Sequence, residues 1–254
     1  MKNLIVDIGN SFISFGVFLG DELVERFDVP SDETHVAKIK DLLKSFIKDK
    51  KLKVDDFNGG LISSVVPMFT VSIKKAIKEV MGISLDILSK EHFSDIEMIV
   101  DNRDEVGGDI IADVKAAKTL YKGPALVIDL GTITKNIVID KNGKFIGVSF
   151  FPGVEACISS MRDKTALLPG FTLKEKPAKL LGNNTIEAME SGVFYGTLNG
   201  LKSLSKEIED KMGQKLIKIL TGGSAFLFAP YLSDFIYDKD FVLKGINFLY
   251  KKGV

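Results

Sequence analysis

Two short segments of the chain each place an aspartate two residues before a glycine. The first is Asp7-Ile8-Gly9-Asn10-Ser11, and the second is Asp129-Leu130-Gly131-Thr132. Glycine lets the backbone approach a ligand closely, so N–H groups and hydroxyls in such a turn can surround phosphate oxygens. The aspartate can hold a metal ion that bridges those oxygens. One such segment is a weak signal, but two at matching places favour phosphate and metal binding over two ordinary turns.

Two other glycine-rich segments precede predicted helices, and each has two interpretations. Thr221-Gly222-Gly223-Ser224 is either a tight strand-to-helix connection or a turn that brings backbone close to a nucleotide, where a helix N-terminus favours anionic groups. Glu105-Val106-Gly107-Gly108-Asp109 ends in a carboxylate that either caps the next helix or accepts a proton from a substrate hydroxyl. Spacing alone does not choose between these interpretations.

Several other chemistries lack the residues that they need. The chain has no G-x-x-x-x-G-K-[ST], no G-x-G-x-x-G and no G-x-S-x-G segment, which disfavours P-loop, Rossmann and α/β-hydrolase sites. The single Cys157 cannot form an intramolecular disulfide, which indicates a reducing compartment. His35 and His92 are too far apart in the sequence for a helical zinc motif.

The composition limits the classes of partner. Lys plus Arg and Asp plus Glu both number 34, so the formal net charge is zero, whereas a dedicated nucleic-acid-binding protein normally carries a basic excess. No apolar run approaches the length of a membrane span. Hydrophobic residues at 45% and charged residues at 27% are typical of a folded soluble domain. We therefore expect a cytoplasmic protein that binds neither nucleic acid nor a membrane.

Each Asp-Gly segment follows a predicted strand and starts a predicted three-stranded meander. The first meander has apolar strands over 4–6, 12–19 and 23–29, with a Gly20-Asp21 turn between the last two. The second starts at Ala125 and continues over 136–139 and 144–151, with an Asn142-Gly143 turn that is a strong hairpin signal. A proline closes each meander.

The repeat extends beyond the meanders. Helices are predicted over 34–48, 69–81 and 109–121, and further strands over 60–66 and 85–88. Ile62-Ser63-Ser64-Val65 before a helix has a counterpart in Leu220-Thr221-Gly222-Gly223 before a predicted helix over 224–232. A repeat at roughly half the chain length predicts two similar halves, which we assign to residues 1–118 and 119–254. Asp7 and Asp129 are then expected at equivalent places, facing one cleft.

Taken together, these motifs resemble those of the type III pantothenate kinases, a family within the acetate kinase, sugar kinase, heat-shock protein 70 and actin superfamily. The resemblance covers nearly the whole chain, in the same order, and rests on Asp7 to Ser11, Ile62 to Pro67, Glu105 to Ile110, Asp129 to Lys135, Pro152-Gly153, Thr165 to Pro169, Asn184 to Gly196 and Thr221 to Gly223. It implies an α/β fold of two similar ribonuclease H-like, or actin-like ATPase, halves, each a mixed sheet with flanking helices.

The resemblance also implies an activity: ATP-dependent phosphorylation of pantothenate to 4′-phosphopantothenate, the first step of coenzyme A synthesis, by a homodimer. By this resemblance Asp109 is the general base, and Asp129 binds a monovalent cation, K⁺ or NH₄⁺. ATP and Mg²⁺ are expected at Asp7, Ile8, Gly9, Asn10, Ser11, Thr132, Gly222 and Gly223, with Asp7 as the Mg²⁺ ligand. Pantothenate is expected to contact Val100, Gly107, Gly108, Asp109, Ile110 and Thr185.

The chain departs from the family pattern at four positions. Ile110 stands where the family has Arg, Val100 where it has Tyr, Arg103 where it has Pro, and Lys135 where it has the last Thr of G-T-A-T-T. Because Arg and Tyr offer polar contacts that Ile and Val lack, we expect weakened or shifted use of pantothenate with the ATP site retained. The alternative is a catalytically weak or inactive relative that senses a nucleotide or metabolite and acts as an accessory or regulatory protein.

Overall fold

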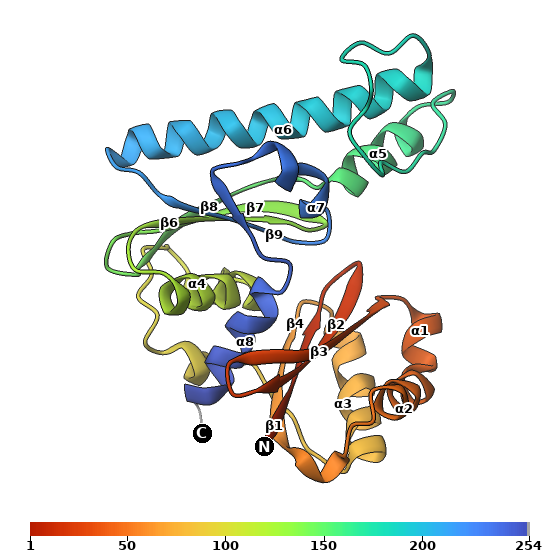
Figure 1. The fold of residues 1–254 in the computed structure, drawn as a ribbon, viewed down its shortest axis with the longest axis vertical. Helices are drawn as coiled ribbons and strands as arrows, with labels where there is room; N and C mark the ends of the chain where they lie inside the picture. Colours follow the sequence, from red (N-terminus) through yellow and green to blue (C-terminus); the bar gives the residue numbers. More distant parts are fainter. Residues whose placement is uncertain (253–254) are drawn as a thin grey trace. The chain divides into compact units, whose positions relative to one another are not determined.

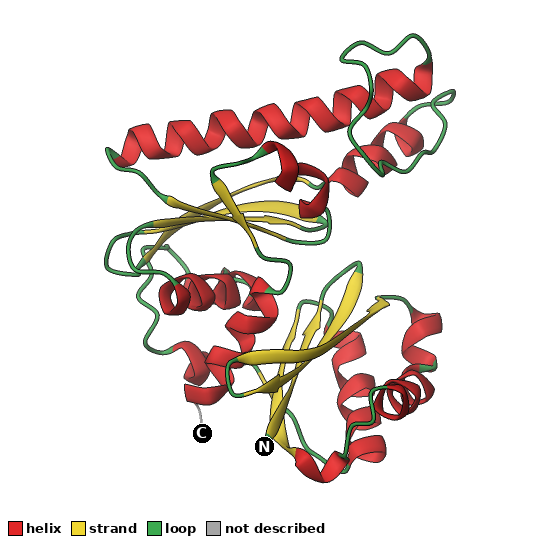
Figure 2. Ribbon diagram, viewed as in Figure 1, coloured by secondary structure: helices red, strands yellow, loops and turns green. Residues whose placement is uncertain are grey.

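The computed structural model describes residues 1–252, which form two units, each built on a five-stranded mixed sheet (Figures 1 and 2). Unit 1 contains Met1–Leu120 together with residues 240–252, and unit 2 contains Tyr121–Lys239. The division into residues 1–118 and 119–254 differs from these units at the end of the chain, because helix α8 (Phe241–Lys252) packs on helix α4 (Gly108–Leu120) in unit 1.

The sheet of unit 1 has the strand order β3-β2-β1-β4-β5. β1 pairs antiparallel with β2 and parallel with β4, and β3 and β5 form the edges. The strands are β1 (Lys2–Ile8), β2 (Phe12–Leu19), β3 (Glu22–Pro30), β4 (Phe57–Ser64) and β5 (Asp86–Ile87). The other helices of the unit are α1 (Glu33–Ala37), α2 (Ile39–Asp49) and α3 (Pro67–Met81), with 3₁₀ turns at Val54–Asp56, Lys90–Phe93 and Arg103–Glu105.

Side-chain alternation along β1 decides which face of this sheet carries the site. Leu4, Val6 and Ile8 belong to the core that packs against α2 and α3. The side chain of Asn3 lies on the other face, where its Nδ2 donates to Asn247 Oδ1 of α8 at 3.3 Å. Successive side chains of a strand point to opposite faces. Asp7 therefore lies on the face that α4 and α8 cover (Figure 1).

The single helix predicted over 34–48 is two helices in the structure. α1 begins after Asp32, whose carboxylate accepts from the His35 N–H at 2.9 Å, and it ends at Lys38. Lys38 has φ −97° and ψ 3°, outside the helical region, and its N–H donates to the carbonyl of His35 three residues before it. Apolar spacing continues through such a break, so the pattern did not reveal it.

Unit 2 repeats the topology of unit 1. Its sheet has the order β8-β7-β6-β9-β10, and β6 pairs antiparallel with β7 and parallel with β9. The strands are β6 (Ala125–Leu130), β7 (Ile133–Ile139), β8 (Phe145–Pro152), β9 (Ile217–Thr221) and β10 (Phe235–Tyr237). The helices are α5 (Val154–Lys164), α6 (Thr185–Met212) and α7 (Ala225–Phe228), and a 3₁₀ turn over Ala229–Tyr231 replaces the rest of the helix predicted over 224–232. The predicted fold class, two similar halves with mixed sheets and flanking helices, is confirmed.

In unit 2 the core again takes alternate residues of the central strand. Leu126, Ile128 and Leu130 pack with Phe194 of α6 and Phe228 of α7. Asp129 therefore lies on the opposite face of the sheet from α6. α6 spans 28 residues and begins directly after Asn184, whose side chain accepts from the Glu187 N–H.

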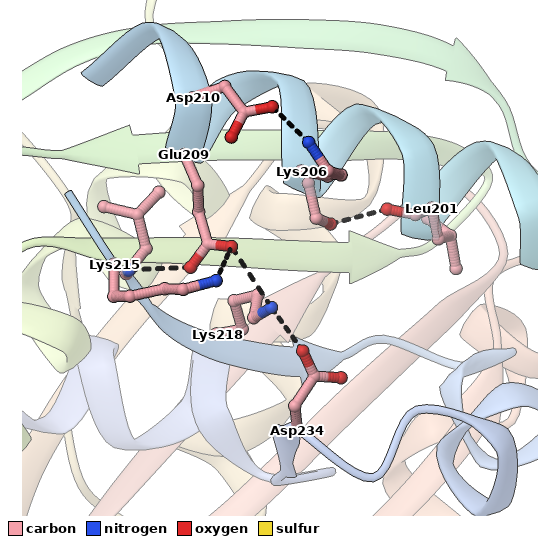
Figure 3. Close-up of polar contacts among 9 residues, drawn as sticks. Leu201, Lys206, Glu209, Asp210, Lys215, Lys218 and Asp234 are labelled. Carbon is pink, nitrogen blue, oxygen red and sulfur yellow. Dashed lines mark hydrogen bonds and ion pairs between the residues drawn. The ribbon is translucent and has the colours of Figure 1, made fainter. Parts of the chain in front are cut away.

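A cluster of charged residues joins the end of α6 to the start of β9 (Figure 3). Glu209 Oε1 accepts from the Leu216 N–H at 3.0 Å, and its Oε2 lies 3.2 Å from Lys215 Nζ and 3.6 Å from Lys218 Nζ. Lys218 also forms an ion pair with Asp234. The Leu216 N–H bond and then the two lysines hold the pKa of Glu209 below its ordinary value, against the opposing effect of burial.

Glu209→Gln tests this connection. A lowered carboxyl pKa in the folded state stabilises the fold above the unfolded pKa and loses that effect as the pH falls through the folded pKa. We expect the variant to lose about 1.5 kcal/mol of unfolding free energy at pH 7, the low end for a hydrogen bond to a charged group, because Lys215 is mostly exposed. When unfolding in urea is measured below pH 4.5, the ordinary pKa of Glu, the difference in unfolding free energy between the variant and wild type should become smaller. Asp210→Asn, which removes an exposed partner of Lys206, is the control.

Candidate functional site

The first Asp-Gly segment lies at the carboxyl end of β1. Asp7 is half-buried and stands between Ser14 of β2 and Ser63 of β4, its directly opposite neighbours. Gly9 N–H donates to the Phe12 carbonyl at 3.0 Å and closes the turn, and the side chains of Asn10 and Ser11 are exposed. The turn therefore presents a carboxylate, an amide and a hydroxyl at one end of the sheet, where the carboxylate could hold a metal ion and the turn could hold phosphate oxygens.

The start of α4 lies against the same end of the sheet, beside Ser63 of β4. A Cβ on Gly108 would come within 2.8 Å of Ser63 Oγ, so a larger residue here would require the Ser63 side chain to move. Asp109 follows in the first turn, where its Oδ1 accepts from the Ile110 N–H at 2.8 Å. Asp109 thus lies inside the helix rather than before it, which weakens the N-cap interpretation. Unit 1 brings Asp7, Ser63 and Asp109 to one end of one sheet face.

A pocket of about 340 Å³ in unit 1 borders Gly108. It is lined by Ser64, Ile87, Leu88, Ser89, Lys90, Phe93, Arg103, Asp104, Val106 and Gly108. Arg103 Nη2 donates to the Ile96 carbonyl at 2.9 Å, and Lys90 Nζ lies 2.5 Å from Asp104 Oδ1. Two cationic side chains therefore line a pocket next to the Asp109 segment.

The other predicted substrate residues are placed differently. Ile110 is 5% exposed, and neither Ile110 nor Val100 is among the residues that line this pocket. Gly107 is half-buried, directly before α4. Thr185 belongs to unit 2, where it is the exposed first residue of α6. Their contacts with a substrate stay predictions.

The second Asp-Gly segment occupies the equivalent place in unit 2. Asp129 is directly opposite Lys135 of β7 and Thr221 of β9, as Asp7 is opposite Ser14 and Ser63. Asp129 is 5% exposed, and its Oδ2 forms an ion pair with Lys135 Nζ. The predicted equivalence of the two aspartates in the topology is confirmed, and their facing one cleft stays a prediction.

The Thr221-Gly222-Gly223 turn closes over Asp129. Gly222 has φ +94°, and a Cβ there would lie 2.4 Å from Asp129 Oδ1 and 2.5 Å from the Leu130 backbone nitrogen. The Ser224 N–H then donates to the Leu130 carbonyl at 3.0 Å, as Val65 N–H does to Ile8 in unit 1. The structure therefore shows a tight connection between β9 and α7. Gly223 and Thr132 are exposed, and their binding of a nucleotide stays a prediction.

The sequence patterns missed two hydroxyls beside these aspartates. Ser63 Oγ and Thr221 Oγ1 are buried, and neither finds a hydrogen-bond partner within residues 1–252. A buried hydroxyl without a partner is costly, so such groups mark places where a ligand or water completes the bonding. The available signal was a hydroxyl residue at the same position of each half.

No three His, Cys, Asp or Glu side chains within residues 1–252 gather into a metal-binding group. Mg²⁺ keeps several waters and needs only one or two carboxylates plus substrate phosphates, so Asp7 beside the unpartnered Ser63 hydroxyl fits such an ion. Burial raises the pKa of the Cys157 thiol, which disfavours a thiolate nucleophile there.

Solved structures with the same fold define its class. An activator of 2-hydroxyisocaproyl-CoA dehydratase from Clostridium difficile, solved with bound ADPNP, superposes with a TM-score of 0.62 at 11% identity, covering 100% of this chain and 95% of that one. A Campylobacter jejuni protein described as a Baf-family transcriptional activator gives 0.61 at 21% identity, covering 98% of both chains. The fold is that of the actin-like ATPases.

Sequence similarity defines the family within this class. The family model of the type III pantothenate kinases matches residues 3–207. A type III pantothenate kinase from Brevibacillus brevis is 32% identical over 98% of each chain, and one from Dehalococcoides mccartyi is 31% identical over 98% of this chain and 95% of its own. The chain belongs to the type III pantothenate kinase family, a family of phosphotransferases with an alcohol group as acceptor.

Gly222→Ala tests the closed turn over Asp129. The new methyl would occupy the space of Asp129 Oδ1 and of the Leu130 backbone in a conformation that L-residues rarely adopt. We expect a loss of about 1–3 kcal/mol of unfolding free energy, and weaker nucleotide binding. Gly223→Ala is the matched control, because a Cβ there meets no atom within 4 Å. Equal unfolding free energies for the two variants would contradict the role given to Gly222.

Proposed function

We propose that this protein transfers the γ-phosphoryl group of ATP to the hydroxyl of pantothenate and so forms 4′-phosphopantothenate in coenzyme A biosynthesis. One observation carries the proposal beyond family membership. Asp109 lies in the first turn of α4, next to Gly108, which lines a pocket with two cationic side chains, and this turn lies at the same end of the sheet as Asp7. A proton acceptor, a phosphate-binding turn and a candidate acceptor pocket thus belong to one unit.

The residues around Asp7 are suited to ATP and Mg²⁺. In our proposal the Asp7 carboxylate holds Mg²⁺, and Ile8, Gly9, Asn10 and Ser11 surround the phosphates through backbone N–H groups and exposed polar side chains. Thr132, Gly222 and Gly223 contribute further nucleotide contacts. When bound, Mg²⁺ neutralises charge that develops on the phosphate oxygens during transfer.

Asp109 acts as the general base. Its carboxylate accepts the proton of the pantothenate hydroxyl as that oxygen attacks the phosphoryl group. Helix α4 holds the carboxylate in place through the Ile110 N–H, which donates to Oδ1. Gly107 and Gly108 lie next to the acceptor, where glycine allows close approach.

The acceptor contacts differ from the family pattern. Pantothenate carries a carboxylate, and in our proposal Arg103 and Lys90 attract that group in the pocket beside Gly108. The side chains of Ile110 and Val100 offer no polar contact, so we propose a weakened or shifted preference for pantothenate relative to the family. In our proposal Thr185 is a further substrate contact.

A homodimer in the cytoplasm completes the proposal. The family resemblance supports the dimer, and the single cysteine and the composition support the location. No helix within residues 1–252 is long and apolar enough to cross a membrane.

Asp109→Asn tests the activity and the role of the base together. Wild-type protein should release ADP from ATP only when pantothenate is present, as a coupled assay measures. We expect the variant to be slower by about 10²–10⁴-fold, the usual contribution of a general base, with an unchanged melting temperature. No ADP release by wild type, although ATP binds, would instead support the regulatory alternative.

Arg103→Ala tests the acceptor pocket. Loss of a hydrogen bond to a charged group costs about 1.5–3 kcal/mol, so KM for pantothenate should rise by about 10–100-fold with little change in kcat. Because Arg103 also holds the Ile96 carbonyl, the melting temperature must be compared with wild type. Arg162→Ala removes an exposed arginine of unit 2 and is the control. An unchanged KM for pantothenate would contradict the assignment of its carboxylate to this pocket.

A further inference from the structure

Lys135 places its ammonium group on the carboxylate that the family resemblance assigns to a monovalent cation. The side chains of Asp129 and Lys135 are only 7% and 13% exposed, and Lys135 Nζ forms an ion pair with Asp129 Oδ2. The two residues are directly opposite each other in the antiparallel β6–β7 pair, so both side chains lie on the same face. The contact is set by strand register rather than by a flexible loop.

Both oxygens of the Asp129 carboxylate have close neighbours. Oδ2 contacts the Lys135 ammonium, and Oδ1 lies under Gly222, where a Cβ would come within 2.4 Å of it. A buried carboxylate requires a compensating positive charge, and Lys135 supplies one. For a second cation about 4 Å from the ammonium, at an effective dielectric constant of 20, the repulsion would weaken cation binding roughly a thousandfold.

The equivalent place in unit 1 shows that the lysine is specific to this half. The directly opposite neighbour of Asp7 is Ser14, whose hydroxyl accepts from Arg26 Nη2 at 3.3 Å. The two aspartates share their topology but have different residues across the hairpin. The residues at Asp129 therefore do not fit a bound K⁺ or NH₄⁺ ion.

We propose that Lys135 replaces the monovalent cation, so that this protein works without K⁺ or NH₄⁺. The side-chain ammonium carries the same charge as a bound NH₄⁺ ion and is held to its site by the chain, at a high effective concentration. The inference rests on the proposed kinase activity. It concerns only the charge beside Asp129 and assigns no step of the transfer to it.

The first test measures wild-type protein in buffers of equal ionic strength, with either tetramethylammonium chloride or KCl. We expect equal turnover of ATP with pantothenate in both salts, and equal melting temperatures. A several-fold activation by KCl, or a melting temperature raised by KCl alone, would overturn the proposal. The melting measurement reports cation binding even if the protein does not phosphorylate pantothenate, so failure of the proposed function remains distinguishable.

The second test uses Lys135→Thr, which introduces the residue that the family has at this position. Without K⁺ we expect turnover to fall about tenfold or more, and KCl or NH₄Cl should restore it. KCl should also raise the melting temperature of this variant by about 3 °C or more. Lys141→Thr makes the same change at an exposed position in the β7–β8 turn and should respond like wild type. A Lys135→Thr protein that ignores K⁺ in both measurements would contradict the proposal.

Discussion

In each sheet the central strand pairs antiparallel with one neighbour and parallel with the other, and this pairing fixes the position of the aspartate. One set of alternate residues enters the core, so the aspartate, which belongs to the other set, lies on the opposite face at the carboxyl end of the strand. A shift of one residue in register would bury Asp7 or Asp129 among leucines and valines. Three further features depend on this register: the turn after the aspartate, the hydroxyl on the neighbouring parallel strand, and the close approach of a helix or a glycine turn.

The same backbone plan supports different electrostatics in the two units. In unit 1 the aspartate has a serine on each side and a helix start with a second carboxylate nearby. In unit 2 it has a lysine on one side and a threonine on the other, under a glycine turn. The two halves share these positions, whereas single residues decide whether a lysine ammonium or only hydroxyl side chains lie beside the aspartate. Fold similarity alone therefore does not determine the ligands of each half.

Much of this arrangement could be predicted from the sequence, because it depends on local patterns. Period-two alternation and the Asn142-Gly143 turn predicted the meanders, and the repeated Asp-Gly segments predicted equivalent sites. The partners of those sites depend on contacts between distant segments. That Lys135 faces Asp129 requires the exact register of a hairpin, and that Arg103 lines a pocket beside Gly108 requires the path of a long connection. Neither of these two arrangements produces a periodic pattern of residues in the sequence. The return of α8 to unit 1 likewise rests on packing, including the contact of Gly245 with the Ala112 carbonyl.

That return makes unit 1 discontinuous along the chain, with unit 2 inserted within it. Asn3 of the first strand hydrogen-bonds Asn247 of the last helix, a contact that spans nearly the whole sequence. Such long-range contacts close slowly, and during synthesis the N-terminal residues leave the ribosome first. Unit 2 can complete its core from one uninterrupted segment, whereas the face of β1 that carries Asp7 stays partly uncovered until α8 has been synthesised. The order of synthesis thus lets unit 1 mature only after unit 2.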